Sequence, residues 1–340
     1  MNNWIHKSNN ENDNDIVLSS KIKLSRNFKD LPFPNKLNYI KGRENGKNIY
    51  NVLVNELNDE KITLYEMWNS DENINKEYEE KNLISKELFK NADKASFVVN
   101  EDETLSIMIN EEDHIKLQCI TAGLNLEDAL KNAIIIDDKI EKNLNYAFDE
   151  KLGYLTTKLE NLGTGMKASV VIHLPALKMS DEIKNISKHL DQVGINIKGV
   201  YSEGTEVYGN IYEIFNKVSL GITEEDITSQ LKSMVLNIIS EEKKFREILL
   251  SKCKYELEDK VYRAYGILKS AVLLEFKETI NLLSDVRLGA ELSLIDIDKN
   301  KLNELLVVTK NLSLQNHLEK SLDAKQIKFE RAKLVKEILI

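Results

Sequence analysis

The chain has 340 residues, 42% of them hydrophobic and 30% charged, which suits a soluble globular protein of one large domain or two. A formal net charge of -9 at pH 7 argues against nucleic acid or an anionic membrane surface as a partner and favours a basic partner or substrate. No apolar run approaches the roughly 20 residues that span a bilayer, and residues 1–15 lack the apolar core of a secretory signal. Cys119 and Cys253 form neither a disulfide framework nor a metal cluster and have apolar neighbours, so we expect inert thiols in a reducing cytoplasm.

The first ordered segment is predicted to be a strand that begins near Ile16, after a mobile tail at residues 1–14. Lys21 and Lys23 alternate with apolar residues, so both ammonium groups point to one face of the strand. Two cations on one face suit a polyphosphate. They equally suit a solvated edge strand, and the pattern alone favours that second interpretation.

Further along the chain, apolar spacing predicts helices over 43–58, 72–90, 126–148 and 181–193. Alternation predicts strands over 96–99, 105–109, 195–201 and 210–220, the first two joined as a hairpin and the last two by an acidic turn at 202–206. Thr223, with Asp226 three residues later, predicts the start of a helix that runs to about Lys254. From residue 256 onward the strand signal nearly vanishes, which predicts a separate helical domain.

Three acids and a histidine gather directly after the second strand of the hairpin, in Asn110-Glu111-Glu112-Asp113-His114. Such a cluster suits a metal or acid/base site, and it equally suits an acidic loop that stays solvated. His114 and His173 are expected to be core or supporting residues, because no metal-ligand spacing surrounds either of them. We therefore expect no metal-binding residues.

A glycine-bearing turn precedes an apolar run in the segment from Asn161 to Pro175. Gly163 and Gly165 allow a positive φ or a close approach of the backbone to a ligand, and Lys167 follows where a phosphate could be held. The alternative is a hairpin turn that enters a buried strand. Glycine turns are common, so residue types alone favour this structural interpretation.

Several of these segments together resemble a known family. The motifs are Asn110-Glu111-Glu112-Asp113-His114, Asn161-Leu162-Gly163-Thr164-Gly165, His173-Leu174-Pro175-Ala176-Leu177 and Tyr201-Ser202-Glu203-Gly204. They resemble the ATP:guanido phosphotransferases. The segments 257–268 and 282–289 are similar to the bacterial protein arginine kinases of that superfamily, rather than to creatine-type kinases.

The resemblance implies an α+β fold, with an antiparallel sheet flanked by helices in a phosphagen-kinase-like catalytic domain at 15–255 and an all-helical dimerisation and regulatory domain at 256–340. It implies transfer of the γ-phosphoryl group of ATP, with Mg²⁺, to arginine side chains of client proteins in a stress response. Family partners would be a second copy of the chain, an activator protein and a Clp-type protease. Such a reaction needs charge neutralisation and positioning more than covalent chemistry.

Site residues are carried over by the same motifs. Glu112 and Glu203 match the acids that face the acceptor guanidinium. The positions that match the nucleotide site are Ser19, Ser20, Lys21, Ile22, Lys23, Asn82, Lys116, Lys167, Ala168, Ser169, Val170, Val171, Lys198, Gly199, Val200, Tyr201 and Ser202. A degenerate phosphoarginine-sensing motif is expected at Ile327, Lys328 and Arg331.

The chain departs from the family pattern at the nucleotide site. Lysine replaces arginine at Lys21, Lys23, Lys116, Lys167 and Lys198, and Asn82 stands where histidine is expected. The family's Cys-Pro-Thr-Asn is replaced by Lys158-Leu159-Glu160-Asn161, so its reactive cysteine is lost, and the sensing Arg-Asp pair is replaced by Ile327-Lys328.

Two interpretations of these departures stay open. Either the chain has drifted toward lysine and still works as a kinase, or it is a degenerate pseudokinase that acts as a dimeric interaction module. Lysine carries the charge but cannot form the bidentate fork of arginine. Arg26, Arg263, Arg287 and Arg331 survive at family positions, which favours impaired chemistry because drift would have reached them too. The intact Glu112, Glu203 and glycine turn favour activity. A free-arginine kinase is a weaker third interpretation.

Overall fold

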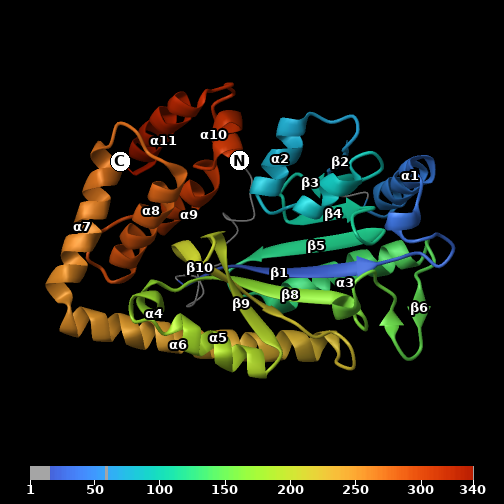
Figure 1. Ribbon diagram of the computed structural model, residues 1–340, viewed down its shortest axis with the longest axis horizontal. Helices are drawn as coiled ribbons and strands as arrows, with labels where there is room; N and C mark the ends of the chain where they lie inside the picture. The colour runs from blue at the N-terminus through green and yellow to red at the C-terminus, as the bar shows by residue number, and fades with distance from the viewer. Residues whose placement is uncertain (1–15, 58–59, 340) are drawn as a thin grey trace. The chain divides into compact units, whose positions relative to one another are not determined.

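The computed structural model describes residues 16–57 and 60–339, which fall into two compact units (Figure 1). The first unit holds 19–170 and 215–232, and the second holds 16–18, 171–214 and 233–339. These units do not follow the domain boundaries expected from the sequence, at 255 and 256, which stay a prediction. The expected tail at 1–14 lies outside the described residues.

Eight strands are hydrogen-bonded in the order β2-β3-β4-β5-β1-β8-β10-β9. Their bounds are β1 Val17–Arg26, β2 Ile62–Glu66, β3 Ser96–Asn100, β4 Leu105–Ile109, β5 Ile115–Ala122, β8 Met166–His173, β9 Ile195–Glu203 and β10 Glu206–Asn216. The pairs from β2 to β1 are antiparallel, and the expected β3–β4 hairpin is confirmed. A second small sheet pairs β6 (Phe148–Asp149) with β7 (Gly153–Tyr154).

The strand that carries the two lysines is not at an edge, so the edge-strand interpretation is wrong. β1 lies between β5 and β8, and the Lys21 residue is only 8% exposed. Ile22 and Leu24, on the opposite face, are fully buried. Alternation alone could not distinguish a solvated face from one that is covered.

Three helices of the first unit are α1 (Tyr39–Glu56), α2 (Glu72–Glu80) and α3 (Leu126–Glu141). A 3-10 turn, η3, at Lys86–Asn91 comes after α2 in the chain. The helix expected over 72–90 is therefore broken, because Asn82 has a left-handed φ of 59° that a helix cannot contain. The helix expected over 126–148 ends at Glu141, where the Asn143 side chain caps the Lys139 carbonyl. α3 packs on β5 and against α1 (Figure 1).

The described part of the chain beyond residue 224 contains helices and no strand, which confirms the expected helical character of 256–340 as far as residue 339. These helices are α6 (Glu224–Lys252), α7 (Lys254–Ser270), α8 (Phe276–Glu291), α9 (Lys299–Val308), α10 (Asn311–His317) and α11 (Ala324–Leu339). The backbone N–H of Asp226 bonds Thr223 Oγ1 at 3.1 Å, so the expected N-cap of α6 is confirmed. No helix among the described residues is long and apolar enough to cross a membrane.

Inside the second unit, α7 packs on α8 and α11, and α9 packs on α8, α10 and α11. Their buried side chains form one apolar cluster with parts of β9 and β10. The short helix α4 (Pro175–Met179) and α5 (Ile183–Gln192) complete the unit, with α5 on β9. The turn between β9 and β10 is only Gly204-Thr205, because Glu203 and Glu206, expected in a longer turn, belong to the strands.

The glycine turn before β8 is dictated by close packing. Gly163 has a φ of 99°, and a Cβ there would lie 2.2 Å from the Ser219 carbonyl oxygen. Gly165 has a φ of 64°, and its Cβ would lie 2.6 Å from Arg26 Nη1. The turn leads into a buried strand, as the structural interpretation predicted, although the strand before it, β7, pairs with β6 instead of β8.

Candidate active site

The acidic turn between β4 and β5 separates its side chains into different environments. Asp113 is buried, and its Oδ1 accepts hydrogen bonds from Asn27 Nδ2 and the Thr157 N–H, both at 2.7 Å. His114 is buried too, with Nδ1 accepting from the Phe28 N–H at 3.2 Å, and burial lowers its pKa to about 4. Both residues therefore hold the turn in place, which confirms the expected core role of His114.

Glu111 and Lys116 form a buried ion pair beneath this turn. The Glu111 side chain is 0% exposed and the Lys116 side chain 15%, and Ser85 Oγ also donates to Glu111. Burial raises the pKa of Glu111, but the Lys116 charge and the hydrogen bonds from Lys116, Ser85 and the Glu112 N–H outweigh it. The net pKa is lowered, so Glu111 is an anion at neutral pH.

Glu112 is the acid of the turn that faces outward, with a side chain 19% exposed. Its Oε1 lies 2.8 Å from Lys158 Nζ, and its Oε2 lies 3.7 Å from Lys116 Nζ. Thr157 Oγ1 donates to its carbonyl oxygen at 2.8 Å, so the backbone is held as well. Hydrogen bonding to Glu112 raises the pKa of Lys158, which therefore stays protonated.

A row of cations occupies one face of β1 and β5. Ser25 pairs with Lys116 and Lys23 with Gln118 across the two strands, so Lys21, Lys23 and Lys116 share a face. Lys116 is thus common to this row and to the Glu112 site. Periodicity predicted that Lys21 and Lys23 share a face; the β1–β5 register adds Lys116 to that face.

Two other β1 positions expected at the nucleotide lie on the opposite face. Ser20 Oγ donates to the Gly123 carbonyl at 2.8 Å and accepts from the Asn125 N–H at 3.0 Å, and Ile22 is 0% exposed. Ser19 shares the lysine face by alternation. Asn82 is an exposed turn residue whose carbonyl accepts from Gln118 Nε2 at 3.1 Å.

The expected positions on β8 and β9 differ in burial. Ala168 and Val170 point into the core at 0% exposure, while Lys167 is half-buried at the start of β8, its Nζ 3.8 Å from the centre of the Phe215 ring. Lys198 pairs with Glu213 at 2.9 Å. The remaining expected positions are Ser169, Val171, Gly199, Val200, Tyr201 and Ser202, of which Val171, Val200 and Tyr201 pack on the apolar cluster of the second unit.

The second expected catalytic acid, Glu203, ends β9 in a more exposed cluster of the second unit. Its side chain is 81% exposed, and Tyr208 Oη donates to it at 3.1 Å. Lys277 Nζ, from α8, lies 3.7 Å from Glu203 Oε2, 3.4 Å from Glu206 Oε2 and 3.9 Å from the centre of the Tyr208 ring. Sequence reasoning missed Lys277 and Tyr208, because neither falls within a motif.

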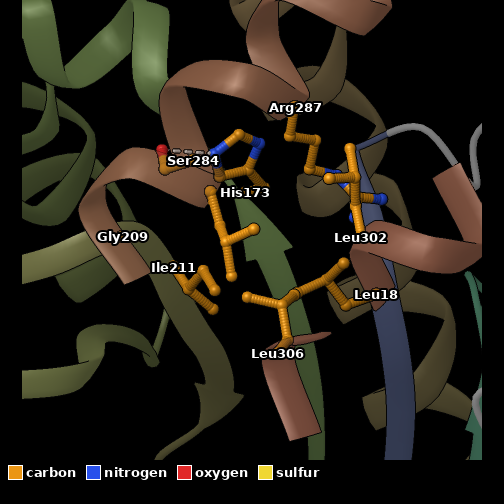
Figure 2. A pocket seen from close by; sticks show the side chains of 9 residues that line it. Leu18, His173, Gly209, Ile211, Ser284, Arg287, Leu302 and Leu306 are labelled. Carbon is orange, nitrogen blue, oxygen red and sulfur yellow. Dashed lines mark hydrogen bonds between the residues drawn. The ribbon is translucent and has the colours of Figure 1, made fainter. Parts of the chain in front are cut away.

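His173, from the His-Leu-Pro-Ala-Leu motif, lies in a small buried cavity of the second unit (Figure 2). Its Nε2 lies 2.8 Å from Ser284 Oγ, while burial and then the nearby Arg287 charge hold its pKa well below the usual range. The cavity, lined also by Leu18 and Leu306, has about 10 Å³ of space open to water. That is room for about one water molecule, so His173 belongs to the core, as expected.

The sensing motif expected at 327–331 serves as a structural cross-link in this structure. Arg331 is 1% exposed, and it donates to the Thr309 carbonyl at 2.7 Å and the Leu274 carbonyl at 2.8 Å. Lys328 pairs with Glu275, and Ile327 packs on the helical cluster. Of the two cysteines, Cys119 is buried, and burial raises the pKa of its thiol to about 12. Cys253 is exposed, so the apolar surroundings expected for it are wrong, while its inertness stays a prediction.

Four of the six arginines share a property that the sequence did not reveal. Arg26, Arg246, Arg287 and Arg331 are each at most 4% exposed. Arg26 donates to Asp137 through Nε and Nη2 at 2.9 and 2.7 Å, and through Nη1 to the Ser25 and Thr164 carbonyls. Arg43 is half-buried, and the Arg263 side chain is 73% exposed.

Comparisons with known proteins agree with these motifs. A family model described as ATP:guanido phosphotransferase, C-terminal catalytic domain, matches residues 45–245, and one described as Protein-arginine kinase McsB C-terminal domain matches residues 254–340. The protein-arginine kinase of Clostridium botulinum (strain Eklund 17B / Type B) is 60% identical over 339 residues, covering 100% of this chain and 99% of that protein. The protein-arginine kinase of Clostridium acetobutylicum is 49% identical over 341 residues and covers 100% of both chains.

A crystal structure of lombricine kinase matches with a TM-score of 0.59 at 24% identity, over 68% of each chain, which shows a common fold. The expected antiparallel sheet flanked by helices is thereby confirmed. The resemblance deduced from the motifs is confirmed as well. The chain belongs to the protein-arginine kinases, within the ATP:guanido phosphotransferase superfamily.

Proposed function

We propose that this protein transfers the γ-phosphoryl group of Mg-ATP to arginine side chains of client proteins. The observation that carries the proposal is the position of Lys116. It shares a face of the sheet with Lys21 and Lys23, and it also contacts Glu112. An acid for the acceptor beside cations for the donor phosphates is the arrangement that this transfer requires.

In this proposal, Glu112 and Glu203 hold the acceptor guanidinium and help to remove its proton, because an arginine is otherwise protonated at neutral pH. The lysines of β1 and β5, with Lys167 and Lys198, neutralise the nucleotide phosphates as point charges. Mg²⁺ bound to the phosphates neutralises further charge. The described residues contain no group of three or more His, Cys, Asp or Glu that could hold a metal ion.

The retained arginines weaken the case for a pseudokinase. Arg26 and Arg331 each use at least three N–H groups in buried positions, where an ammonium could not reach the same acceptors. Drift toward lysine would therefore spare these positions and reach those where a point charge suffices. At the buried positions the retention of arginine follows burial and geometry, and it does not require that the nucleotide site has decayed; the exposed Arg263 has no such explanation.

We further propose that the protein acts in the cytoplasm as a homodimer, in a stress response, with an activator protein and a Clp-type protease as partners. The match of residues 254–340 to the C-terminal domain of protein-arginine kinases supports this assignment. The division into catalytic and helical domains at 255 and 256 and a regulatory role for 327–331 belong to the same proposal.

The test is formation of phosphoarginine on a basic client protein with Mg-ATP, measured by mass spectrometry under conditions that preserve the acid-labile N–P bond. Calorimetry with Mg-ADP measures nucleotide binding independently. Wild-type protein should give both signals. Folded protein that binds the nucleotide but yields no phosphoarginine would overturn the proposed transfer, and absence of nucleotide binding up to millimolar Mg-ADP would favour the pseudokinase.

A further inference from the structure

We propose that Lys158 is a resident counter-ion of Glu112, which an incoming arginine must displace, so that Lys158 sets the affinity of the site for its acceptor. The inference rests on the proposed function, in which Glu112 receives the acceptor. Lys158 stands where the family pattern has its reactive cysteine, so the sequence alone indicated only that this cysteine is missing. The structure shows that the replacement residue contacts a candidate catalytic acid.

The geometry permits displacement. Lys158 contacts Oε1 of Glu112 at 2.8 Å, while Oε2 lies 3.7 Å from Lys116, so neither lysine bridges both oxygens of the carboxylate. The Lys158 side chain is 46% exposed, on a loop next to the short 3-10 helix η4 (Leu159–Asn161). An ammonium with water available can leave without being stranded in the protein interior.

The competition favours a guanidinium. An arginine side chain presents two parallel N–H groups to a carboxylate, whereas a lysine acts as a single point charge. A ligand amine would exchange one ammonium for another with little gain. An arginine would replace a single contact with a bidentate one, so the carboxylate itself prefers arginine, while the cost of breaking the Lys158 pair weakens arginine and amine binding by the same factor.

A series of substitutions tests this inference by equilibrium binding, without turnover. Calorimetry measures the Kd of a short arginine peptide, and of the same peptide with lysine, for the wild-type protein, Lys158→Ala and Lys158→Arg. Removing an exposed ion pair should lower the Kd of the arginine peptide about two- to fivefold in Lys158→Ala. Lys158→Arg keeps the charge and adds a fork, so its Kd should rise above that of the wild type.

The lysine peptide supplies the selectivity measurement. Lys158→Ala should bind both peptides more tightly by the same factor and leave the arginine-to-lysine discrimination unchanged, because both ligands displace the same ion pair; a gain confined to one peptide would contradict displacement. Lys131→Ala, which removes an exposed lysine of α3, is the matched control and should match the wild type in both affinities. Thermal unfolding of each variant verifies that the fold is intact.

Equal Kd values across the three residues at position 158, or no binding of either peptide, would overturn the inference. The phosphoarginine assay remains a separate measurement. A wild-type enzyme that phosphorylates arginine while the series shows equal affinities would leave the proposed function standing without this role for Lys158. If the Kd of the arginine peptide rises from Lys158→Ala to wild type to Lys158→Arg, but the protein forms no phosphoarginine, the displacement would be supported and the proposed transfer overturned.

Discussion

Glu112 and Glu203 carry the same chemical group in two different settings. Glu112 is 19% exposed, and a backbone hydrogen bond, a buried ion pair beneath it and two lysines fix its surroundings. Glu203 lies at the tip of a hairpin with its side chain 81% exposed to solvent, and its partners there are Tyr208 and Lys277. Water screens the electrostatic interactions of Glu203 far more than those of Glu112. Although family motifs identify both acids, we therefore expect them to contribute unequally to catalysis.

The largest expected effect concerns the acids themselves. Glu112→Gln should lower kcat for phosphoarginine formation by about 10²- to 10⁴-fold, because it removes a positioned proton acceptor from a partly buried site. Glu203→Gln should cost about tenfold, in keeping with a screened, hydrogen-bonded anion. Steady-state kinetics on one basic client protein measures both, with Glu150→Gln, an exposed acid, as the control. Equal losses of kcat in the two variants would contradict the proposed difference between Glu112 and Glu203 and indicate that the hairpin becomes enclosed when substrates bind.

The next effect concerns the stability of the first site. Lys116→Met leaves the fully buried Glu111 carboxylate without its cation and should cost about 3 kcal/mol of unfolding free energy at pH 7. Urea unfolding measures this loss. The control is Lys61→Met, which breaks a pair whose side chains are 83% and 61% exposed, and it should cost at most about 0.5 kcal/mol.

The pH dependence of that loss has a definite sign. The pKa of Glu111 is lowered in the folded wild type, so its contribution to stability is present above the unfolded pKa and disappears as pH falls through the folded pKa. Without Lys116, burial dominates and raises the same pKa. The difference in stability between wild type and Lys116→Met should therefore begin to shrink as the pH falls through the raised pKa of the variant, and should go on shrinking until the pH has passed the lowered pKa of the wild type. A difference that stayed constant with pH would contradict the buried pairing.

The smallest expected effect is at the second site. Lys277→Ala removes ion pairs at 3.4 and 3.7 Å from an exposed cluster and should leave the unfolding free energy nearly unchanged, because water screens these pairs. Urea unfolding checks this expectation, and turnover should change less than about threefold. A much larger loss of turnover with unchanged stability would show that α8 positions the Glu203 hairpin through Lys277.

Sequence reasoning succeeded where the signal is local. The Thr223 cap and the β3–β4 hairpin depend on neighbouring residues, and the structure confirms both. The strand β2 was missed because its burial lacks a clean alternation, and the helix at 72–90 was over-extended because Asn82 adopts a left-handed turn. The edge assignment of β1 failed because its neighbours, β5 and β8, are distant in sequence.

The same limit applies to the candidate site. Motifs identified Glu112 and Glu203, and periodicity placed Lys21 and Lys23 on one face. The partners of Glu112 and Glu203, however, come from other segments: Lys158 from the loop near η4, and Lys277 from α8. Long-range pairing of this kind follows from the fold, so no pattern within a single segment could have predicted it.

The scarcity of accessible arginine has a consequence for the protein as a potential target of its own chemistry. Four of the six arginines are at most 4% exposed, and Arg43 donates from Nε to the Asp93 carbonyl at 2.8 Å. Only Arg263 presents a largely exposed side chain. An enzyme that modifies accessible arginines would thus find few on its own folded surface and would act mainly on other proteins, and self-labelling at one of the four buried arginines would indicate unfolding.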